Sequence, residues 1–167
     1  MKIILACACA MLIYSGCYNG PKTKQFTLSD GFYQAMNLVP DTSQLPVLNT
    51  GEVLIGFDTL FNPGDFTRVV VDTSDYVPLE LGVSPVAEPE AGNKKLLSVS
   101  FTAPAAAKIK SFTAKRLMKE VVIVLDGKAI TMHKIRDTIT GDKMQITRCG
   151  DDACEYLYVK MKNRIKK

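Results

Sequence analysis

The side chain that most often serves as a general base near neutral pH is histidine, and this chain of 167 residues contains only one. His133 is the only histidine, and its position beside Lys134 in a predicted turn favours an ordinary surface residue over a catalytic base. The sequence contains no Gly-x-Ser-x-Gly motif, no phosphate-binding glycine loop and no metal-ligand spacing. We therefore predict a protein that is not an enzyme, with no catalytic residue, no metal site and no cofactor.

The carboxylates support the same interpretation. Asp72 and Asp75 could form an acid–base pair, but the polar residues between them indicate a turn between two strands. Asp126 fits a hairpin turn, and Asp151-Asp152 fits the first turn of a helix. Each of these five acidic residues thus has a structural interpretation that does not require catalysis.

The first 16 residues have the pattern of an export signal. Lys2 precedes an apolar run over residues 3–14, and Ser15-Gly16 supplies the small residues that a signal peptidase requires. The run is too short for a membrane-spanning helix, which needs about 20 residues. No later segment is apolar enough to span a membrane, so we expect an extracytoplasmic protein.

Cys17 directly follows this segment, and the stretch Leu12-Ile13-Tyr14-Ser15-Gly16-Cys17 resembles a bacterial lipobox. Tyr14 departs from the pattern, since an aliphatic residue is usual there. The resemblance implies a lipoprotein signal peptide over residues 1–16 and lipidation of Cys17, with palmitate among the acyl chains that anchor the protein to a membrane. The alternative is an ordinary secretory signal in which the cysteine is incidental. By the same analogy, Tyr18 differs from the Asp of inner-membrane retention and favours the outer membrane within the cell envelope.

Two cysteines lie beyond the signal and its anchor. Cys149 and Cys154 form an even pair, and exported proteins fold in an oxidising compartment. We predict a disulfide between a strand end and the first turn of the last helix; the alternative is two unpaired thiols.

Charge is distributed unevenly along the chain. Residues 1–93 carry 4 basic and 10 acidic side chains, whereas residues 94–167 carry 17 basic and 7 acidic ones. The basic tail is a candidate binding surface for anionic lipid or acidic protein segments, and the alternative is a solvated helix end. Its members are Lys160, Lys162, Arg164, Lys166 and Lys167. Nucleic acid is excluded as a partner by the predicted compartment.

The hydrophobic pattern divides the chain into a tether and lead-in over residues 17–50 and a folded domain over residues 51–167. A helix should begin near Pro104, with Ile109 and Phe112 on its apolar face. Asp126-Gly127 between two apolar runs predicts a hairpin. Further strands are expected at 68–71, 77–83, 96–101, 121–125, 129–132 and 143–147, a helical turn at 135–139, and a last helix from residue 151.

This order of elements predicts an α+β fold, a mostly antiparallel sheet with both main helices packed on one face. In that arrangement one apolar cluster should join the strand at 121–125 to both helices. Its predicted members are Val122, Val124, Ile109, Phe112 and Leu157.

With these elements placed, residues 97–162 resemble the head subdomain of the first periplasmic domain of SecD. The resemblance is carried by the strand at 97–101, the helix at 105–113, the segment Ile123-Val124-Leu125-Asp126-Gly127, the turn at 135–139 and the final strand and helix. His133 stands where the family commonly has Pro. The SecD membrane domain has no counterpart here, so the resemblance implies a head that contacts ligand without the part that drives export.

Taken together, the resemblance implies a non-catalytic module that binds a protein or extended polypeptide near the membrane, with a link to protein export. The alternative is an immunity-type or structural lipoprotein of the cell envelope.

Overall fold

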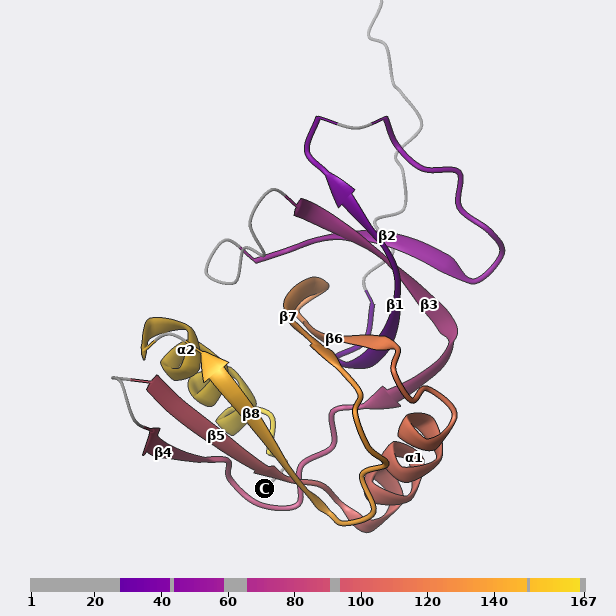
Figure 1. Cartoon of the computed structure of the whole chain (residues 1–167). Coiled ribbons are helices and arrows are strands. Elements are labelled where there is room, and N and C mark those ends of the chain that lie inside the picture. Colours follow the sequence, from indigo (N-terminus) through magenta and orange to yellow (C-terminus); the bar gives the residue numbers. More distant parts are fainter. Residues whose placement is uncertain (1–27, 43, 59–65, 91–93, 150, 166–167) are drawn as a thin grey trace, which may run out of the picture.

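The computed structural model describes residues 28–42, 44–58, 66–90, 94–149 and 151–165 of the chain. These residues form eight strands and two helices (Figure 1). In chain order the elements are β1 (Gly31–Pro40), β2 (Glu52–Gly56), β3 (Phe66–Pro78), β4 (Val86–Glu90), β5 (Lys94–Ser100), α1 (Ala103–Ala114), β6 (Glu120–Leu125), β7 (Lys128–Lys134), β8 (Lys143–Cys149) and α2 (Asp151–Lys162).

The larger sheet has five antiparallel strands in the order β2-β3-β1-β6-β7. The two outer strands, β2 and β7, approach each other. Just after β2, the Asp58 N–H donates to the Ala129 carbonyl of β7 at 2.8 Å, and Phe57 forms a bridge with Ala129. Gly31 permits the close crossing of β1 and β3, since a Cβ there would overlap the Val77 carbonyl oxygen. The sheet therefore curls around a small core of its own.

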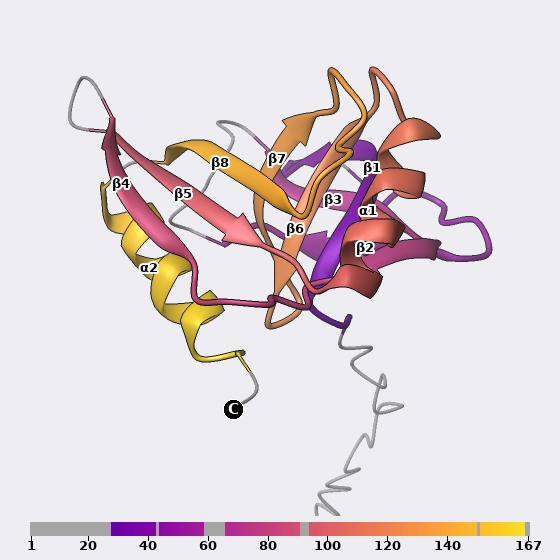
Figure 2. The same cartoon turned by 90° about the horizontal axis from the view of Figure 1, so that it is seen from below.

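The smaller sheet has three antiparallel strands in the order β4-β5-β8. Helix α2 packs against this sheet, whereas α1 lies beside β3 of the larger sheet. Figure 2 shows the two helices on separate parts of the molecule, with β8 on the side of the smaller sheet that faces β6 and β7.

The predicted α+β fold with two helices on one face of one sheet is wrong. The structure is mostly antiparallel β, with two sheets and two short helices that cover different sheets. The physical reason is that residues 31–78 supply three strands of their own, so the C-terminal strands divide between two sheets. Residues 31–40, within the predicted lead-in, form a strand between β3 and β6.

Strand β6 is buried on both faces, as an unbroken apolar run indicates. Alternation divides its residues between two cores. Val121, Ile123 and Leu125 join the core that also contains Ile109, Phe112 and Leu157, whereas Val122 and Val124 join the core inside the curled sheet. The predicted single cluster is therefore wrong for Val122 and Val124.

The hairpin at Asp126-Gly127 is confirmed. Both residues have positive φ, 52° and 75°, as a two-residue turn of type I′ requires. The predicted helical turn at 135–139 is wrong, because this segment is irregular and residue 135 is bonded through its backbone to Met118 and Lys119. The predicted turn at Asp72–Asp75 is also wrong: these residues lie within β3, where the register against β1 shifts in a bulge.

Candidate functional site

A groove of about 610 Å³ lies between the two sheets. Its floor is apolar and combines three elements: Phe32 from β1, Val121 and Ile123 from β6, and Ile109 and Phe112 from α1. The strand residues alternate and the helix residues are three apart, so each element turns one face toward the groove. A volume of this size is typical of ligand-binding pockets.

One wall of the groove is the edge of β8. The lining includes four consecutive residues of this strand, Lys143, Met144, Gln145 and Ile146. Because consecutive side chains of a strand point to opposite faces, a cavity that borders all four must border the edge of the strand. Strand β8 pairs only with β5 among the described strands, so this edge has no neighbouring strand.

The opposite wall is the extended segment from His133 to Asp137. Its backbone is held by the end of α1: the Met118 N–H donates to the Ile135 carbonyl at 2.8 Å, and the Ile135 N–H donates to the Lys119 carbonyl at 2.9 Å. These two backbone hydrogen bonds hold the segment in place although it is not helical.

The rim of the groove is mainly cationic. Lys134, Arg136 and Lys143 are exposed there, and Asp137 is the acidic residue among the lining side chains. His133 also lies on this wall, with Nε2 3.1 Å from the Thr131 hydroxyl. Its side chain is exposed at the mouth, yet the surrounding groove atoms desolvate the imidazole and lower the pKa of His133. The groove thus combines an apolar floor with a positive rim.

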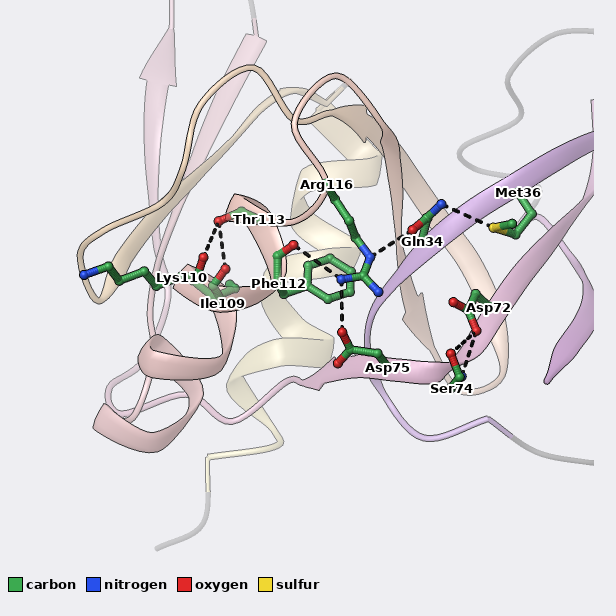
Figure 3. A network of polar contacts seen from close by, with 10 residues as sticks. All are labelled: Gln34, Met36, Asp72, Ser74, Asp75, Ile109, Lys110, Phe112, Thr113 and Arg116. Atoms are coloured by element: carbon green, nitrogen blue, oxygen red, sulfur yellow. Dashed lines mark hydrogen bonds and ion pairs between the residues drawn. The ribbon is translucent and has the colours of Figure 1, made fainter.

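Helix α1 is held in place by the polar contacts of Arg116, which Figure 3 shows. The guanidinium donates to Gln34 Oε1 at 2.9 Å and to Asp75 Oδ2 at 3.0 Å, and it lies 4.1 Å above the Phe112 ring. Asp75, a candidate member of a carboxylate pair in the sequence, is thus an ion-pair partner of Arg116. Asp72 Oδ1 instead accepts from the Ser74 N–H and hydroxyl.

A second contact joins α1 to the loop that precedes β8. The Thr113 hydroxyl donates to the Ile109 carbonyl at 2.8 Å and accepts from the Ile139 N–H at 3.1 Å. Floor and walls of the groove are therefore linked through one helix.

The basic tail does not form a single free surface. Lys160 donates to Asp126 at 2.6 Å, and Arg164 pairs with both Asp126 and Asp30. The hydrogen bond from Lys160 and the charge of Arg164 hold the pKa of Asp126 below its ordinary value. Lys162 lies 5.5 Å from the Tyr158 ring. Lys166 and Lys167 lie outside the described residues.

The predicted cysteine sites remain predictions. Cys17 lies outside the described residues. Cys149 is the last residue of β8 and Cys154 lies in the first turn of α2, as the disulfide prediction requires, but their side chains are outside the described part of the structure. In the described ranges, no group of three or more His, Cys, Asp or Glu residues is arranged to hold a metal ion. Neither described helix has the length and apolarity to cross a bilayer.

The groove was not predicted from the sequence. Its lining comes from residues between 98 and 146 together with Phe32, which are distant along the chain. The available signal was the set of cationic residues within and on both sides of the Ile135–Ile139 segment, which indicates a positive rim without revealing the cavity.

Residues 82–157 match the family model described as the P1 head subdomain of SecDF. A solved structure of SecDF, titled as a membrane component that enhances protein export, is 26% identical, with 63% of this chain and 44% of that chain covered and a TM-score of 0.44. SecDF in a super-membrane-facing form is 25% identical, with 63% and 13% covered and a TM-score of 0.45. SecDF from Thermus thermophilus, described as a translocon-associated membrane protein, is 14% identical, with 83% and 30% covered and a TM-score of 0.42.

This chain thus spans less than half the length of each of these SecDF chains. No curated protein sequence matches it. The match over residues 82–157 confirms the resemblance predicted for residues 97–162, and this part of the chain is a SecD-like head domain.

Proposed function

We propose that this protein, with its SecD-like head domain, is an extracytoplasmic module that binds extended polypeptide during protein export. The observation that carries the proposal is the coincidence of the groove with the head domain. Every lining residue except Phe32 falls within the matched residues 82–157. A groove with an apolar lining suits side chains that exported proteins expose before they fold.

The proposed role is binding rather than catalysis. The titratable groups at the groove are the cationic rim, Asp137 and His133, and Asp137 Oδ1 accepts from the Thr138 N–H at 2.7 Å within its own turn. The Thr131 hydroxyl, 3.1 Å from His133 Nε2, is not among the groove-lining residues, and the described lining itself contains no nucleophile paired with a base. The rim can attract and orient a ligand by charge.

We further propose that acyl chains on Cys17 hold the module at the surface of a membrane of the cell envelope, the outer membrane in preference to the inner. Support comes from the lipobox-like stretch before Cys17. Replacing Cys17 with Ala should abolish palmitate labelling and release the protein from membranes. Equal labelling of wild type and variant would contradict the anchor.

Site-specific photocrosslinking in cells tests the binding role. A photoreactive phenylalanine at Gln145, an exposed residue of the groove wall, should crosslink to many exported precursors. The matched control at Val159, exposed on α2, should yield far fewer. A single effector protein crosslinked at Gln145, in place of many precursors, would contradict the proposal and favour an immunity-type lipoprotein.

A further inference from the structure

We propose that the groove binds its polypeptide as a fourth strand added to the edge of β8, and that it selects segments in which apolar residues alternate with acidic ones. This inference rests on the proposed function and specifies its ligand. It is carried by three features: the direction of the β8 backbone groups, the alternation of the lining side chains and the sign of the rim charge.

The backbone groups of Lys143 and Gln145 point away from β5. Ser100 pairs with Lys143, yet the Ser100 carbonyl accepts from the Gly82 N–H at 2.9 Å on the other side of β5. The next pair is joined directly, because the Phe101 N–H donates to the Asp142 carbonyl at 2.7 Å. Backbone groups of an antiparallel strand alternate in direction, so Lys143 and Gln145 offer N–H and C=O groups on the groove side.

This edge suits strand addition better than the other sheet edges. Strand β4, at the far edge of the smaller sheet, contains Pro89, which lacks an N–H. The outer strands of the larger sheet meet each other at Phe57 and Ala129. The four groove-lining residues of β8 span about 13 Å, enough to pair with about four residues of an extended ligand.

Alternation along β8 then defines the ligand. Ile146 is buried and Met144 half-buried on the core side, whereas Lys143 and Gln145 are exposed on the other side. An added strand follows the same alternation, so every second side chain enters the apolar groove and the others lie level with Lys143. Acidic residues at these outer positions face Lys143, with Lys134 and Arg136 on the opposite rim.

The rim charge also argues against a second copy of this chain as the occupant. A second β8 would bring its own Lys143 into a rim that already contains Lys134, Arg136 and Lys143. Like charges placed across neighbouring strands are destabilising. An acidic and apolar segment of another polypeptide has the complementary charge.

Binding of synthetic peptides to the full-length protein in detergent micelles, measured by fluorescence anisotropy, tests the inference. A peptide of alternating Val and Glu should bind roughly fivefold or more tightly than the same peptide with Lys in place of Glu. Two further Val/Glu peptides carry methyl groups on alternate backbone nitrogens, in the two possible registers. Methylation should weaken binding about tenfold in the register that removes the N–H groups facing β8, and far less in the other register. Equal affinities for all four peptides would overturn the inference.

A matched pair of variants tests the edge from the protein side. Because the Gln145 N–H points away from β5, Gln145→Pro removes a donor on the groove side and leaves the β5 pairing intact. It should weaken the Val/Glu peptide about tenfold relative to Gln145→Ala. If Gln145→Pro binds as Gln145→Ala does, or if it fails to fold and the methylated peptides bind equally, strand addition is overturned. Crosslinking of precursors at Gln145 in cells would then still support the proposed function. If no precursors crosslink there, the proposed function is refuted as well.

Discussion

The two sheets of this molecule differ in whether their edge strands are covered. The five-stranded sheet curls until β2 and β7 meet, and it surrounds a small core that includes Tyr33, Val69 and Val122. The three-stranded sheet stays open, and β8 has no strand beyond it among the described residues. Unpaired strand edges invite association, so folded proteins normally cover them. The larger sheet is thus closed on itself, whereas the smaller sheet presents an edge beside an apolar groove.

An arginine shortly after each helix contacts β1 or the residue just before it. Arg116 follows α1, its side chain is 9% exposed, and it contacts Gln34 in β1. Arg164 follows α2, its side chain is 23% exposed, and it contacts Asp30 just before β1. The buried arginine supports the groove, whereas the more exposed one ties the smaller sheet to the β6–β7 turn. Because Arg116 is the more buried of the two, its substitution should lower the free energy of unfolding by more than substitution of Arg164.

The largest expected effect concerns the core shared by the two regions. Phe112 is 2% exposed and lies on the groove floor. Phe112→Ala should lower the free energy of unfolding by about 3–5 kcal/mol, because it removes apolar contacts and leaves a cavity. Leu117→Ala, at a residue that is 47% exposed, is the matched control and should change stability by less than about 1 kcal/mol. Equal costs in chemical denaturation would mean that the core is misplaced.

The second effect concerns the more buried arginine, Arg116. Arg116→Met keeps the apolar contact with Phe112 but removes the bonds to Gln34 and Asp75, so it should cost about 2–3 kcal/mol. Arg116→Lys should recover only part of this, because one ammonium lacks the planar fork that reaches both partners. Denaturation curves of the two variants measure the difference, and a neutral Arg116→Met would contradict the supporting role.

The third effect depends on the predicted disulfide at the junction of β8 and α2. Reduction of a Cys149–Cys154 bridge should lower stability by about 2 kcal/mol, since the closed loop is short. Mass spectrometry of the unreduced protein should show a mass two hydrogens below that of the dithiol. Two thiols that alkylate freely without reduction would refute the bridge.

Local elements of the fold could be predicted because neighbouring residues determine them. Asp126-Gly127 specifies its turn through backbone conformation, and Pro104 with Ile109 and Phe112 specifies α1. The last helix is likewise set by Leu157 and Met161, which are both buried.

What could not be predicted depends on contacts between distant segments. The sequence predicts two strands in place of β3 because Asp72 and Asp75 resemble a turn, and only the pairing with β1 shows that they lie in a bulge. The run at 121–125 does not reveal which core each residue enters, since both of its faces are apolar. The groove follows from the division into two sheets, so it could not be inferred before that division was known.

The smallest effect concerns the cluster at the β6–β7 turn. Asp126→Asn should cost about 1 kcal/mol or less, because the Asp126 side chain is half exposed and solvent screens its pairs with Arg164 and Lys160. The folded protein lowers the pKa of Asp126, so the ionised carboxylate stabilises the fold above its unfolded pKa of about 4. That stabilisation is lost as the pH falls through the folded-state pKa. The difference between wild type and variant should therefore be present at pH 7, shrink in about 1 M salt and disappear in acid. A difference that persists in acid would mean that Asp126 acts through its turn conformation, and not through its charge.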